Sequence, residues 1–480
     1  MARTSLVLLA IAARVAALPP LKRTGALRPQ HGALTVRGGS AKKTVTRNPR
    51  AVVVQKRTDV LGASFNLVNN VAGCGFLTLT AGAAGTGYLP AIGLVAFLGA
   101  VSCGSFLLLG EDALRYQASD VRSLWSEAVG ANAWAVDASV AAFCGAAAVI
   151  YHGIVGDVFG PLVEKYLDIP PSITVYAVAL LALFPLCQLD LATLAKFSLM
   201  GCASVFLTAF AILYRAVDGT YAPDGIHRES AVASAATGGC CGVSAKALVL
   251  SANLGLAYVA HYNAPPLAES LARGDGGARR RFRQVTFLSF TVLVALYAGV
   301  MAAGKATFGD AARFAPRPPR RHRRDTPRRR RRGPTHAGPN VLLNYGASDA
   351  LARVARLATG ASIVFGFPLV FSGFYDSATR LLPPAWETSL QKRRGARRTL
   401  GSLCLVLLTA QVALAAGDIG LPAGLAGSLL GGFVVYVLPA MIRWPNAGAV
   451  GRVGCLMLAL LGVGLGLLGA QQTLSAYGLI

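Results

Sequence analysis

Two apolar stretches of this sequence carry polar and helix-breaking residues where a membrane-spanning helix would normally have aliphatic ones. The first, FNLVNNVAGCGFLTLTAG, contains three asparagines and a Gly-Cys-Gly triplet. The second, LGLAYVAHYNAPPLAESL, has the polar triplet His-Tyr-Asn shortly before two prolines. Glycine lowers helix stability, and each proline removes a backbone hydrogen-bond donor. Both stretches are therefore predicted to be interrupted helices, whose unpaired backbone groups can bind a charged small molecule.

The two ends of a zwitterion would suit these unpaired groups. Amide groups near Gly73, Cys74 and Gly75 would lie at the positive end of the second half-helix and suit a carboxylate. The carbonyl groups freed before Pro265 suit an α-ammonium group. The candidates for shaping the side-chain pocket are Tyr258, Tyr262 and Asn263. None of these roles requires covalent chemistry, so no catalytic residue is predicted and the chain is not expected to be an enzyme.

The overall composition indicates which elements must position these stretches. Of the 480 residues, 54% are hydrophobic and only 14% are charged, and the mean hydropathy is +0.53. The apolar residues recur in blocks of about 20, the length of a helix that crosses the hydrocarbon core of a bilayer. The predicted fold class is therefore an all-α polytopic membrane protein. Eleven transmembrane helices are expected, at about residues 60–83, 88–109, 131–155, 172–189, 194–214, 245–266, 284–303, 354–374, 400–416, 421–442 and 450–470.

The order of the interrupted helices predicts an internal repeat. They are the first and the sixth, and a repeat of five helices places its second copy upside down in the membrane. Paired interrupted helices at corresponding positions of inverted halves mark the substrate site of many secondary transporters. We therefore expect a transporter domain over 58–480, with one repeat at about 58–216, the second at about 244–443 and an extra helix at about 450–470.

Close packing is the alternative explanation for the glycines. Gly-rich segments of membrane helices often let two backbones approach each other, and proline kinks are common. Taken singly, Gly73 and Gly75 favour packing. Two interruptions at equivalent positions favour a binding site instead, formed where the interruptions meet.

The net charge of +25 is concentrated in two segments outside the predicted helices. Residues 1–58 contain twelve Lys and Arg and no Asp or Glu, and residues 313–332 contain eleven Arg and one Asp. An early apolar core followed by a basic, acid-free continuation over 1–57 is typical of a signal or transit peptide, with a disordered basic tail as the alternative. The block of like charge at about 313–340 predicts a disordered loop rather than a nucleic-acid site.

Basic residues in the short connections predict the orientation. The segments RNPRAVVVQKR, RGDGGARRRFR and QKRRGARR are expected on the inner side together with the N-terminus. The Arg-rich insert would then lie outside, as the one exception. Short surface helices are predicted within residues 110–130 and in PAWETSL. The leader-like segment favours an organelle membrane, such as a plastid envelope or vacuole, over the plasma membrane.

Cysteine usage predicts no metal centre. The nine cysteines fall mostly in apolar blocks, and none has the spacing of a zinc site or of a disulfide framework. We therefore expect no cofactor other than a coupling ion, either Na⁺ or H⁺. The expected partners are an amino-acid substrate and membrane lipid, without nucleic acid and without an obligate protein partner.

Several segments, taken in order, also resemble one family. FNLVNNVAGCGFLTLTAGAAGTGYLP is similar to the first-helix signature of the amino acid/auxin permease family, especially its vacuolar and sodium-coupled neutral amino-acid transporter branches. FPLCQLDLATLAKFSLMG resembles the segment between that family's fourth and fifth helices, AHYNAPPLAESL its sixth helix, and RLATGASIVFGFPLVFSGFYDSATRLL its eighth. The resemblance covers about 58–470 without the Arg-rich insert. It implies a LeuT-like fold of eleven helices and amino-acid transport driven by Na⁺ or H⁺.

The resemblance also implies where a coupling ion would bind. In sodium-coupled relatives an asparagine of the first helix, here Asn69, and a threonine of the eighth helix contribute to the Na⁺ site. The aligned threonine positions hold Val364 and Gly366, which offer no side-chain oxygen, and Ser362 lies one turn before Gly366 as a substitute. Coupling to H⁺, or exchange, is therefore expected ahead of Na⁺. His261 is the proton candidate because imidazole titrates near neutral pH, although many buried histidines are purely structural.

Other functions remain open at this point. The chain can be a secondary active carrier that works by alternating access around the two interrupted helices. It can instead be a non-transporting amino-acid sensor, a carrier of another small carboxylate such as auxin, or a channel. Gradient-driven, saturable uptake distinguishes a carrier from a sensor or a channel, and the substrate taken up identifies the kind of carrier.

Overall fold

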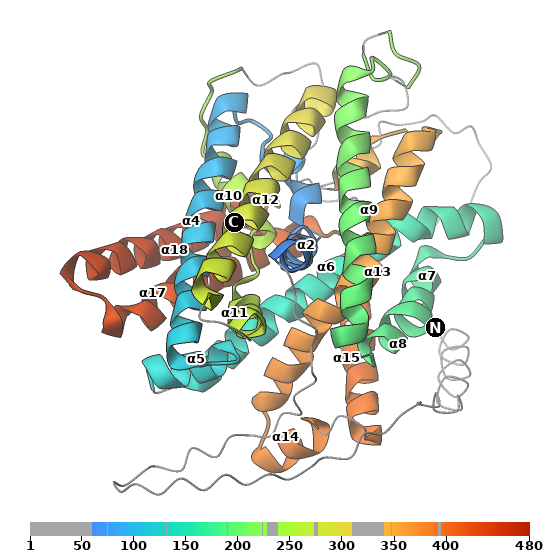
Figure 1. Cartoon of the computed structure of the whole chain (residues 1–480). Helices are drawn as coiled ribbons and strands as arrows, with labels where there is room; N and C mark the ends of the chain where they lie inside the picture. Colours follow the sequence, from blue (N-terminus) through green and yellow to red (C-terminus); the bar gives the residue numbers. More distant parts are fainter. Residues whose placement is uncertain are drawn as a thin grey trace, which may run out of the picture. The chain divides into compact units, whose positions relative to one another are not determined.

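The computed structural model describes residues 60–73, 75–130, 132–189, 191–222, 224–227, 239–272, 277–309, 340–346, 348–391 and 395–480. The predicted leader (1–57), Cys74 and the Arg-rich segment up to residue 339 lie outside these residues. Within them, every regular element is helical (Figure 1). The structure agrees with the predicted all-α class.

The helices follow one another along the chain, and the longest stretches between them are residues 218–246 and 309–340. Three short segments, η2, η7 and η8, are π-helical turns inside longer apolar helices. The elements are α2 (Val60–Val71), η1 (Gly75–Thr78), α3 (Leu79–Gly82), α4 (Tyr88–Tyr116), α5 (Val121–Ala128), α6 (Ala133–Leu167), α7 (Pro171–Val178), η2 (Ala179–Leu183), α8 (Phe184–Cys187), α9 (Leu191–Val217), α10 (Ala247–Ala257), η4 (His261–Asn263), α11 (Ala264–Ala272), α12 (Ala278–Phe308), η6 (Val341–Asn344), α13 (Ala350–Arg380), α14 (Pro384–Gln391), α15 (Ala396–Ala416), α16 (Gly420–Leu425), η7 (Ala426–Gly431), η8 (Phe433–Val437), α17 (Leu438–Arg443), η9 (Trp444–Asn446) and α18 (Ala449–Ala476).

Eight helices in the described part of the chain are long and apolar enough to cross a membrane, or up to nine if the bent pair α2 and η1–α3 is taken as one span. Pro171–Cys187 is a shorter apolar helix, and the sixth predicted span consists of two short helices. A total of eleven spans and an inverted repeat therefore stay predictions. The eight long helices are Tyr88–Tyr116, Ala133–Glu164, Leu199–Val217, Ala278–Phe308, Ala350–Arg380, Ala396–Ala416, Gly420–Asn446 and Ala449–Ala476.

The first predicted span is interrupted, as its glycines indicate. The helix α2 ends at Val71, and the chain resumes at Gly75 in a direction that differs by 47°. The sixth predicted span is interrupted as well, between α10 and α11, but not by its prolines. Pro265 and Pro266 lie in the first turn of α11, where a backbone N–H has no intrahelical acceptor and proline is tolerated. The break lies upstream of them, after Ala257.

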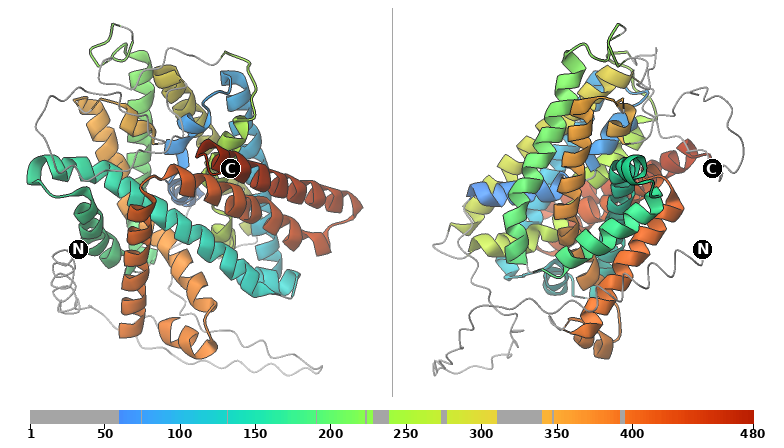
Figure 2. Two further views of the ribbon diagram at one scale, coloured as in Figure 1. Left: turned by 180° about the vertical axis from the view of Figure 1, so that it is seen from behind. Right: turned by 90° about the vertical axis from the view of Figure 1, so that its right-hand side faces the viewer.

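The helices α6 and α9 both pack along α13 (Figures 1 and 2). A β-carbon built on Gly360 of α13 would lie 2.5 Å from the ring of Phe159, so the missing side chain lets α6 approach closely. On the α9 side, the hydroxyl oxygens of Thr208 and Thr359 are 3.0 Å apart and share a hydrogen bond. Small residues and interhelical hydrogen bonds are the expected devices for association between helices in lipid.

A second group of contacts joins α4, α12 and the interrupted helices. The ring of Phe106 on α4 stacks on Phe282 of α12, with ring centroids 5.6 Å apart. Further along α12, Phe290 and Tyr297 pack against Tyr258, which follows α10. This continuous row of aromatic rings fixes the position of α10 relative to α4 and α12.

Glycines bring α10 against the π-helical segment η7. Gly255 of α10 faces Gly427, and a β-carbon built on either one would overlap the main chain of the facing helix. A β-carbon at Gly431 would lie 2.6 Å from the carbonyl oxygen of Gly255. The same device recurs between Gly432 and Gly462, where α18 lies beside this helix (Figure 2). These contacts are made by main chain atoms, so the two helices meet without side chains between them.

Two short helices lie outside the long ones, as predicted. The helix α5 is shorter than the predicted segment because α4 continues to Tyr116, which is a correction to the expected boundary. It begins with a capping box, in which Asp120 accepts from the backbone N–H of Ser123 at 2.8 Å. PAWETSL forms α14, whose Trp386 is exposed.

Candidate functional site

The two interrupted helices meet at Gly75 and Ala257. Gly75 is the buried first residue of η1, and Ala257 is the fully buried last residue of α10. A β-carbon built on Gly75 would lie 2.6 Å from the Cα atom of Ala257, which is too close for any side chain. Close packing and the meeting of the two breaks are therefore one feature, and the two explanations of the glycines do not compete at this position.

The side chain of Tyr297 on α12 contacts both helix ends. Its hydroxyl oxygen lies 3.0 Å from the carbonyl oxygen of Val71, the last residue of α2, and 2.8 Å from that of Ala257. Tyr297 itself is fully buried. The last carbonyl groups of a helix have no intrahelical donor, so each interruption leaves a carbonyl oxygen without a backbone partner. The hydroxyl of Tyr297 is the hydrogen-bond donor to these two oxygens.

Gly73 lies beside α6 and α13. A β-carbon built on Gly73 would overlap the hydroxyl of Tyr151, and one built on Gly366 would lie 3.7 Å from the same hydroxyl. Tyr151 is 4% exposed. Three elements thus converge at this hydroxyl: the end of α2, the middle of α6 and the middle of α13. Gly366 is one of the aligned positions without a threonine, and its place there leaves room for Tyr151.

The three pocket candidates of the sixth span occupy different surroundings. The hydroxyl of Tyr258 donates to the carbonyl oxygen of Val95 on α4 at 3.0 Å, so this side chain points towards α4. Tyr262 faces α6, where its ring centroid lies 6.4 Å from that of Phe143. Asn263 is half-buried, and its backbone N–H closes the turn onto Ala260 at 2.8 Å. Their roles in substrate binding stay predictions.

The imidazole of His261 is fully buried against α4. Its Nε2 lies 2.9 Å from the hydroxyl oxygen of Ser105 and 3.2 Å from the carbonyl oxygen of Ser102. Its Nδ1 has no hydrogen-bond partner among the residues that the structure describes. The ring edge also contacts the ring of Phe106, with centroids 5.5 Å apart. One nitrogen is thus held by α4, while the other remains unpaired in the interior.

The two residues predicted to contribute to an Na⁺ site lie on α2 and α13. Asn69 is 3% exposed, and within the described part of the chain neither its amide nitrogen nor its amide oxygen has a hydrogen-bond partner. Its amide lies against Gly201 of α9, where a β-carbon would overlap the amide oxygen. Ser362 is 6% exposed on α13, which packs along the same helix α9. An unpaired buried amide is costly, which favours a functional reason for Asn69.

Sequence reasoning missed Tyr297 and Tyr151. Both lie in apolar parts of long helices, in the segments ALYAGV and VIYHGIV. A buried tyrosine needs a partner for its hydroxyl, so both residues carried a weak signal. The partner depends on which face of the helix meets which neighbour, and this information is not local.

No group of three or more His, Cys, Asp or Glu side chains in the described residues can hold a metal ion.

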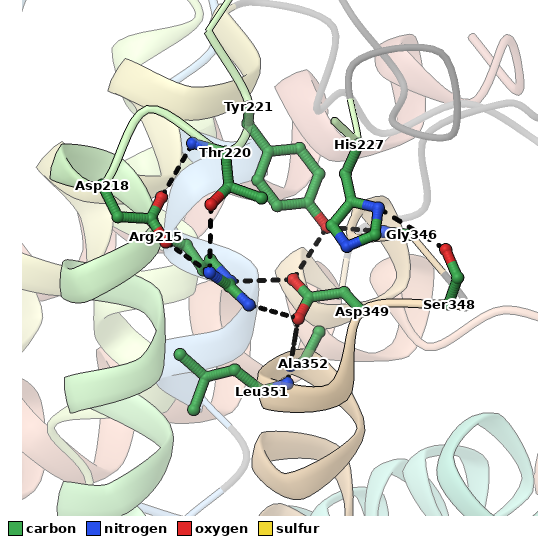
Figure 3. A network of polar contacts seen from close by, with 10 residues as sticks. All are labelled: Arg215, Asp218, Thr220, Tyr221, His227, Gly346, Ser348, Asp349, Leu351 and Ala352. Carbon is green, nitrogen blue, oxygen red and sulfur yellow. Dashed lines mark hydrogen bonds and ion pairs between the residues drawn. The ribbon is translucent and has the colours of Figure 1, made fainter. Parts of the chain in front are cut away.

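A second polar cluster joins the end of α9 to the start of α13 (Figure 3). Arg215 donates from Nε to one carboxylate oxygen of Asp349 at 2.9 Å and from a terminal nitrogen to the other at 2.7 Å. Asp218 also accepts from Arg215. The hydroxyl of Tyr221 donates to Asp349 at 3.0 Å and accepts from the backbone N–H of Gly346 at 2.9 Å. We refer to Arg215, Asp218, Tyr221 and Asp349 as the Arg215 cluster.

Asp349 has two roles in this cluster. It is the N-cap of α13 and accepts from the backbone N–H groups of Leu351 at 2.9 Å and Ala352 at 3.2 Å. Burial alone would raise the pKa of Asp349, but the hydrogen bonds from Arg215, Ala352 and Tyr221 outweigh it and hold the pKa below its usual value. Burial raises the pKa of Tyr221, which keeps its hydroxyl protonated as a donor.

A third polar cluster lies at the opposite ends of the helices, beside α5. Arg380 of α13 is 3.2 Å from a carboxylate oxygen of Asp120 and 3.7 Å from one of Asp137. Asp137 also pairs with Arg122 of α5. The carboxylates come from the cap of α5 and from α6, so the pairs attach this surface helix to the ends of two long helices.

Part of the chain matches a known protein family. Residues 56–313 match the family model described as transmembrane amino acid transporter protein. The match spans just over half of the 480 residues and includes both interrupted helices. A search among curated proteins found no match. Together with the eight long apolar helices, the match identifies a multi-pass integral membrane protein. The chain belongs to the family of transmembrane amino acid transporter proteins.

Proposed function

We propose that the protein is a secondary active transporter that binds an amino acid where its two interrupted helices meet. The observation that carries this proposal is the backbone contact between Gly75 and Ala257, at 2.6 Å from a built β-carbon to Cα. This contact brings the start of η1 and the end of α10 to one place. One helix start and one helix end are complementary in charge to the two ends of an amino acid.

Each end of the substrate has its own backbone partners in this proposal. The carboxylate binds the N–H groups at the start of η1, near Gly73 and Gly75, and Cys74 stays a candidate beside them. The ammonium group binds the carbonyl groups at the ends of α2 and α10. Tyr262 and Asn263 line the pocket for the substrate side chain. Tyr151 is added to them because its hydroxyl reaches Gly73. No residue needs to form a covalent bond.

Coupling to H⁺ is proposed ahead of coupling to Na⁺. The aligned positions of α13 carry Val364 and Gly366 instead of a side-chain hydroxyl, which weakens a Na⁺ site at Asn69 and Ser362. His261 has a buried nitrogen without a partner and can accept a proton there. A proton on this nitrogen would place a charge next to the break of the sixth span.

Alternating access in a LeuT-like arrangement is the proposed mechanism. Each interrupted helix consists of two halves that can tilt separately, and α6, α9 and α13 form a packed unit beside them. The proposal includes eleven spans, in two inverted sets of five and one extra helix. The proposed location is an organelle membrane, because of the leader-like composition of residues 1–57.

Reconstitution into liposomes tests the proposal directly. Uptake of radiolabelled neutral, cationic and aromatic amino acids is measured under a pH gradient, under an Na⁺ gradient and without a gradient. The expected result is saturable accumulation driven by the pH gradient. If neither gradient concentrates any substrate, active symport is excluded. If internal substrate still exchanges for external substrate, the protein is a carrier that is not coupled to an ion gradient.

A pair of histidine variants tests the proton assignment. His261→Gln is expected to abolish the response to the pH gradient while exchange of substrate continues. His152→Gln is the matched control, because His152 is also fully buried and its Nδ1 bonds within its own helix, to the carbonyl oxygen of Ala148 at 2.9 Å. A pH response that survives in the His261 variant would contradict the assignment.

A further inference from the structure

The ends of α2 and α10 direct their last carbonyl groups at one point. The carbonyl oxygens of Val71 and Ala257 both lie within 3.0 Å of the Tyr297 hydroxyl oxygen. Each belongs to a helix C-terminus, which carries a partial negative charge. Two such ends in one buried place form an environment that favours a positively charged group.

The hydroxyl of Tyr297 cannot satisfy both carbonyl oxygens at the same time. A hydroxyl has one proton and donates one hydrogen bond at a time. Two carbonyl oxygens within bonding distance therefore share one donor. An ammonium group has three donors and a full positive charge, so it matches the same two oxygens better than a phenol does.

The position of Tyr297 is fixed by its neighbours and not by these bonds alone. Its ring is fully buried and packs against Tyr258, with ring centroids 5.0 Å apart. The helix α12 also contacts α2 and η1 along its length. The ring can therefore stay in place when its hydroxyl loses a carbonyl partner.

We propose that the Tyr297 hydroxyl substitutes for the substrate's ammonium group in the empty transporter and gives up its carbonyl partners when an amino acid binds. The inference rests on the proposed function and assigns a role to a residue outside the predicted site. It explains why the two acceptors can stay buried without substrate: an unpaired buried carbonyl costs free energy, and the hydroxyl reduces this cost. Substrate binding must then displace the hydroxyl, which opposes binding.

The proposal predicts opposite effects of one substitution on the empty and the loaded protein. Tyr297→Phe removes the hydroxyl and keeps the ring. The empty transporter is destabilised because both carbonyls lose their donor, whereas the loaded transporter is not. The amino acid no longer competes with the hydroxyl, so its dissociation constant is expected to fall roughly fivefold, as for one buried hydrogen bond of about 1 kcal/mol.

The experiment measures binding and thermal unfolding of the detergent-solubilised full chain. Binding is measured with an amino acid that the wild-type protein takes up and with the carboxylic acid that lacks its amino group. Tyr375→Phe is the matched control, because the Tyr375 hydroxyl also donates to a carbonyl oxygen, that of Leu390 at 3.1 Å, far from the interrupted helices in sequence. The control should lower the unfolding temperature equally with and without amino acid and leave the dissociation constant unchanged.

Three results of these measurements are distinguishable. Tighter amino-acid binding by Tyr297→Phe, with no gain for the acid without an amino group, supports the substitution of hydroxyl for ammonium. Equal or weaker binding by this variant, while the wild-type protein binds normally, overturns it and leaves Tyr297 a structural residue. A wild-type protein that binds no amino acid contradicts the proposed function instead.

A second measurement covers the case in which Tyr297→Phe does not fold. 3-Fluorotyrosine at position 297 keeps the hydroxyl, and its ¹⁹F resonance reports the hydrogen bonding of the ring oxygen. The resonance is expected to shift on saturation with the amino acid and to stay unchanged with the acid that lacks the amino group. An unchanged resonance with a bound amino acid would overturn the proposal independently.

Discussion

Gly75 and Ala257 bring two helices that are nearly 200 residues apart in sequence into backbone contact. A β-carbon on Gly75 would lie 2.6 Å from the Cα atom and 2.9 Å from the Cβ atom of Ala257. The nearest atom belongs to the main chain and cannot rotate away. The contact therefore allows only glycine at position 75, and it fixes how closely the interrupted helices approach each other.

Gly75→Ala is expected to reduce uptake in proteoliposomes roughly tenfold, because the added methyl group must separate η1 from α10 and overpacking of this kind costs about 1–3 kcal/mol. Gly104→Ala on α4 is the control, since a β-carbon there has no neighbour within 4 Å. The control should transport normally and be at least as stable, because alanine favours a helix more than glycine does. Normal uptake by the Gly75 variant would disprove the importance of this contact.

Asn69→Leu is expected to raise the unfolding temperature and to lower any part of transport that depends on Na⁺. Both polar atoms of the Asn69 amide are buried without a partner, and each such group costs about 1–3 kcal/mol. A leucine of similar size removes this cost, and it also removes the amide that is the candidate Na⁺ ligand. Asn66→Leu, one turn earlier on α2 and only half-buried, should leave transport unchanged. A stabilised Asn69 variant with full transport would show that the amide has no role in coupling.

Substitutions in the Arg215 cluster should differ in a defined order. Asp349→Ala removes the helix cap and leaves Arg215, which is 16% exposed, without its bidentate partner, so a loss of about 3–5 kcal/mol is expected. Asp349→Asn costs less, because asparagine remains a good N-cap. Asp218→Asn costs least, because Asp218 is not a cap and Arg215 keeps its bidentate partner Asp349. Thermal unfolding in detergent measures the order, and equal losses in all three would mean that the cap and the ion pair contribute nothing specific.

The same cluster predicts a dependence of stability on pH. The pKa of Asp349 is lowered from its ordinary value of 3.8, so the folded protein holds the ionised form more strongly than the unfolded protein does. This contribution is fully present above about pH 5 and is lost as the pH falls through the lowered pKa. The difference in unfolding temperature between wild-type protein and Asp349→Asn should therefore shrink below about pH 4. A difference that is constant from pH 7 to pH 3 would contradict this account.

Much of the helical framework could be predicted from the sequence because a membrane span is a local property. Apolar blocks of sufficient length identified the eight long helices, and glycines identified the interruption after Val71. The two prolines of the sixth span predict a break that lies later in the chain than the one in the structure. Pro265 and Pro266 occupy a helix start, where they fit without disturbing any hydrogen bond.

The contacts of the candidate site could not be predicted, because they depend on tertiary packing. Arg380 pairs with Asp120 and Asp137, which come from the cap of α5 and from α6 and lie more than 200 residues away in the sequence. Tyr297 shows the same limitation. Its partners lie at the ends of two helices that are distant in sequence, and only the fold brings these ends to one hydroxyl.

The contact between Gly255 and Gly427 has a consequence for motion. Interlocked side chains resist sliding, because each must change its rotamer before the next position can form. The surfaces of α10 and η7 consist largely of peptide groups at this point, so few side chains must change rotamer when the two helices move past each other. A displacement of α10 along η7 would change the contact gradually. One added methyl group at Gly255 or Gly427 would overlap the facing main chain and block this displacement.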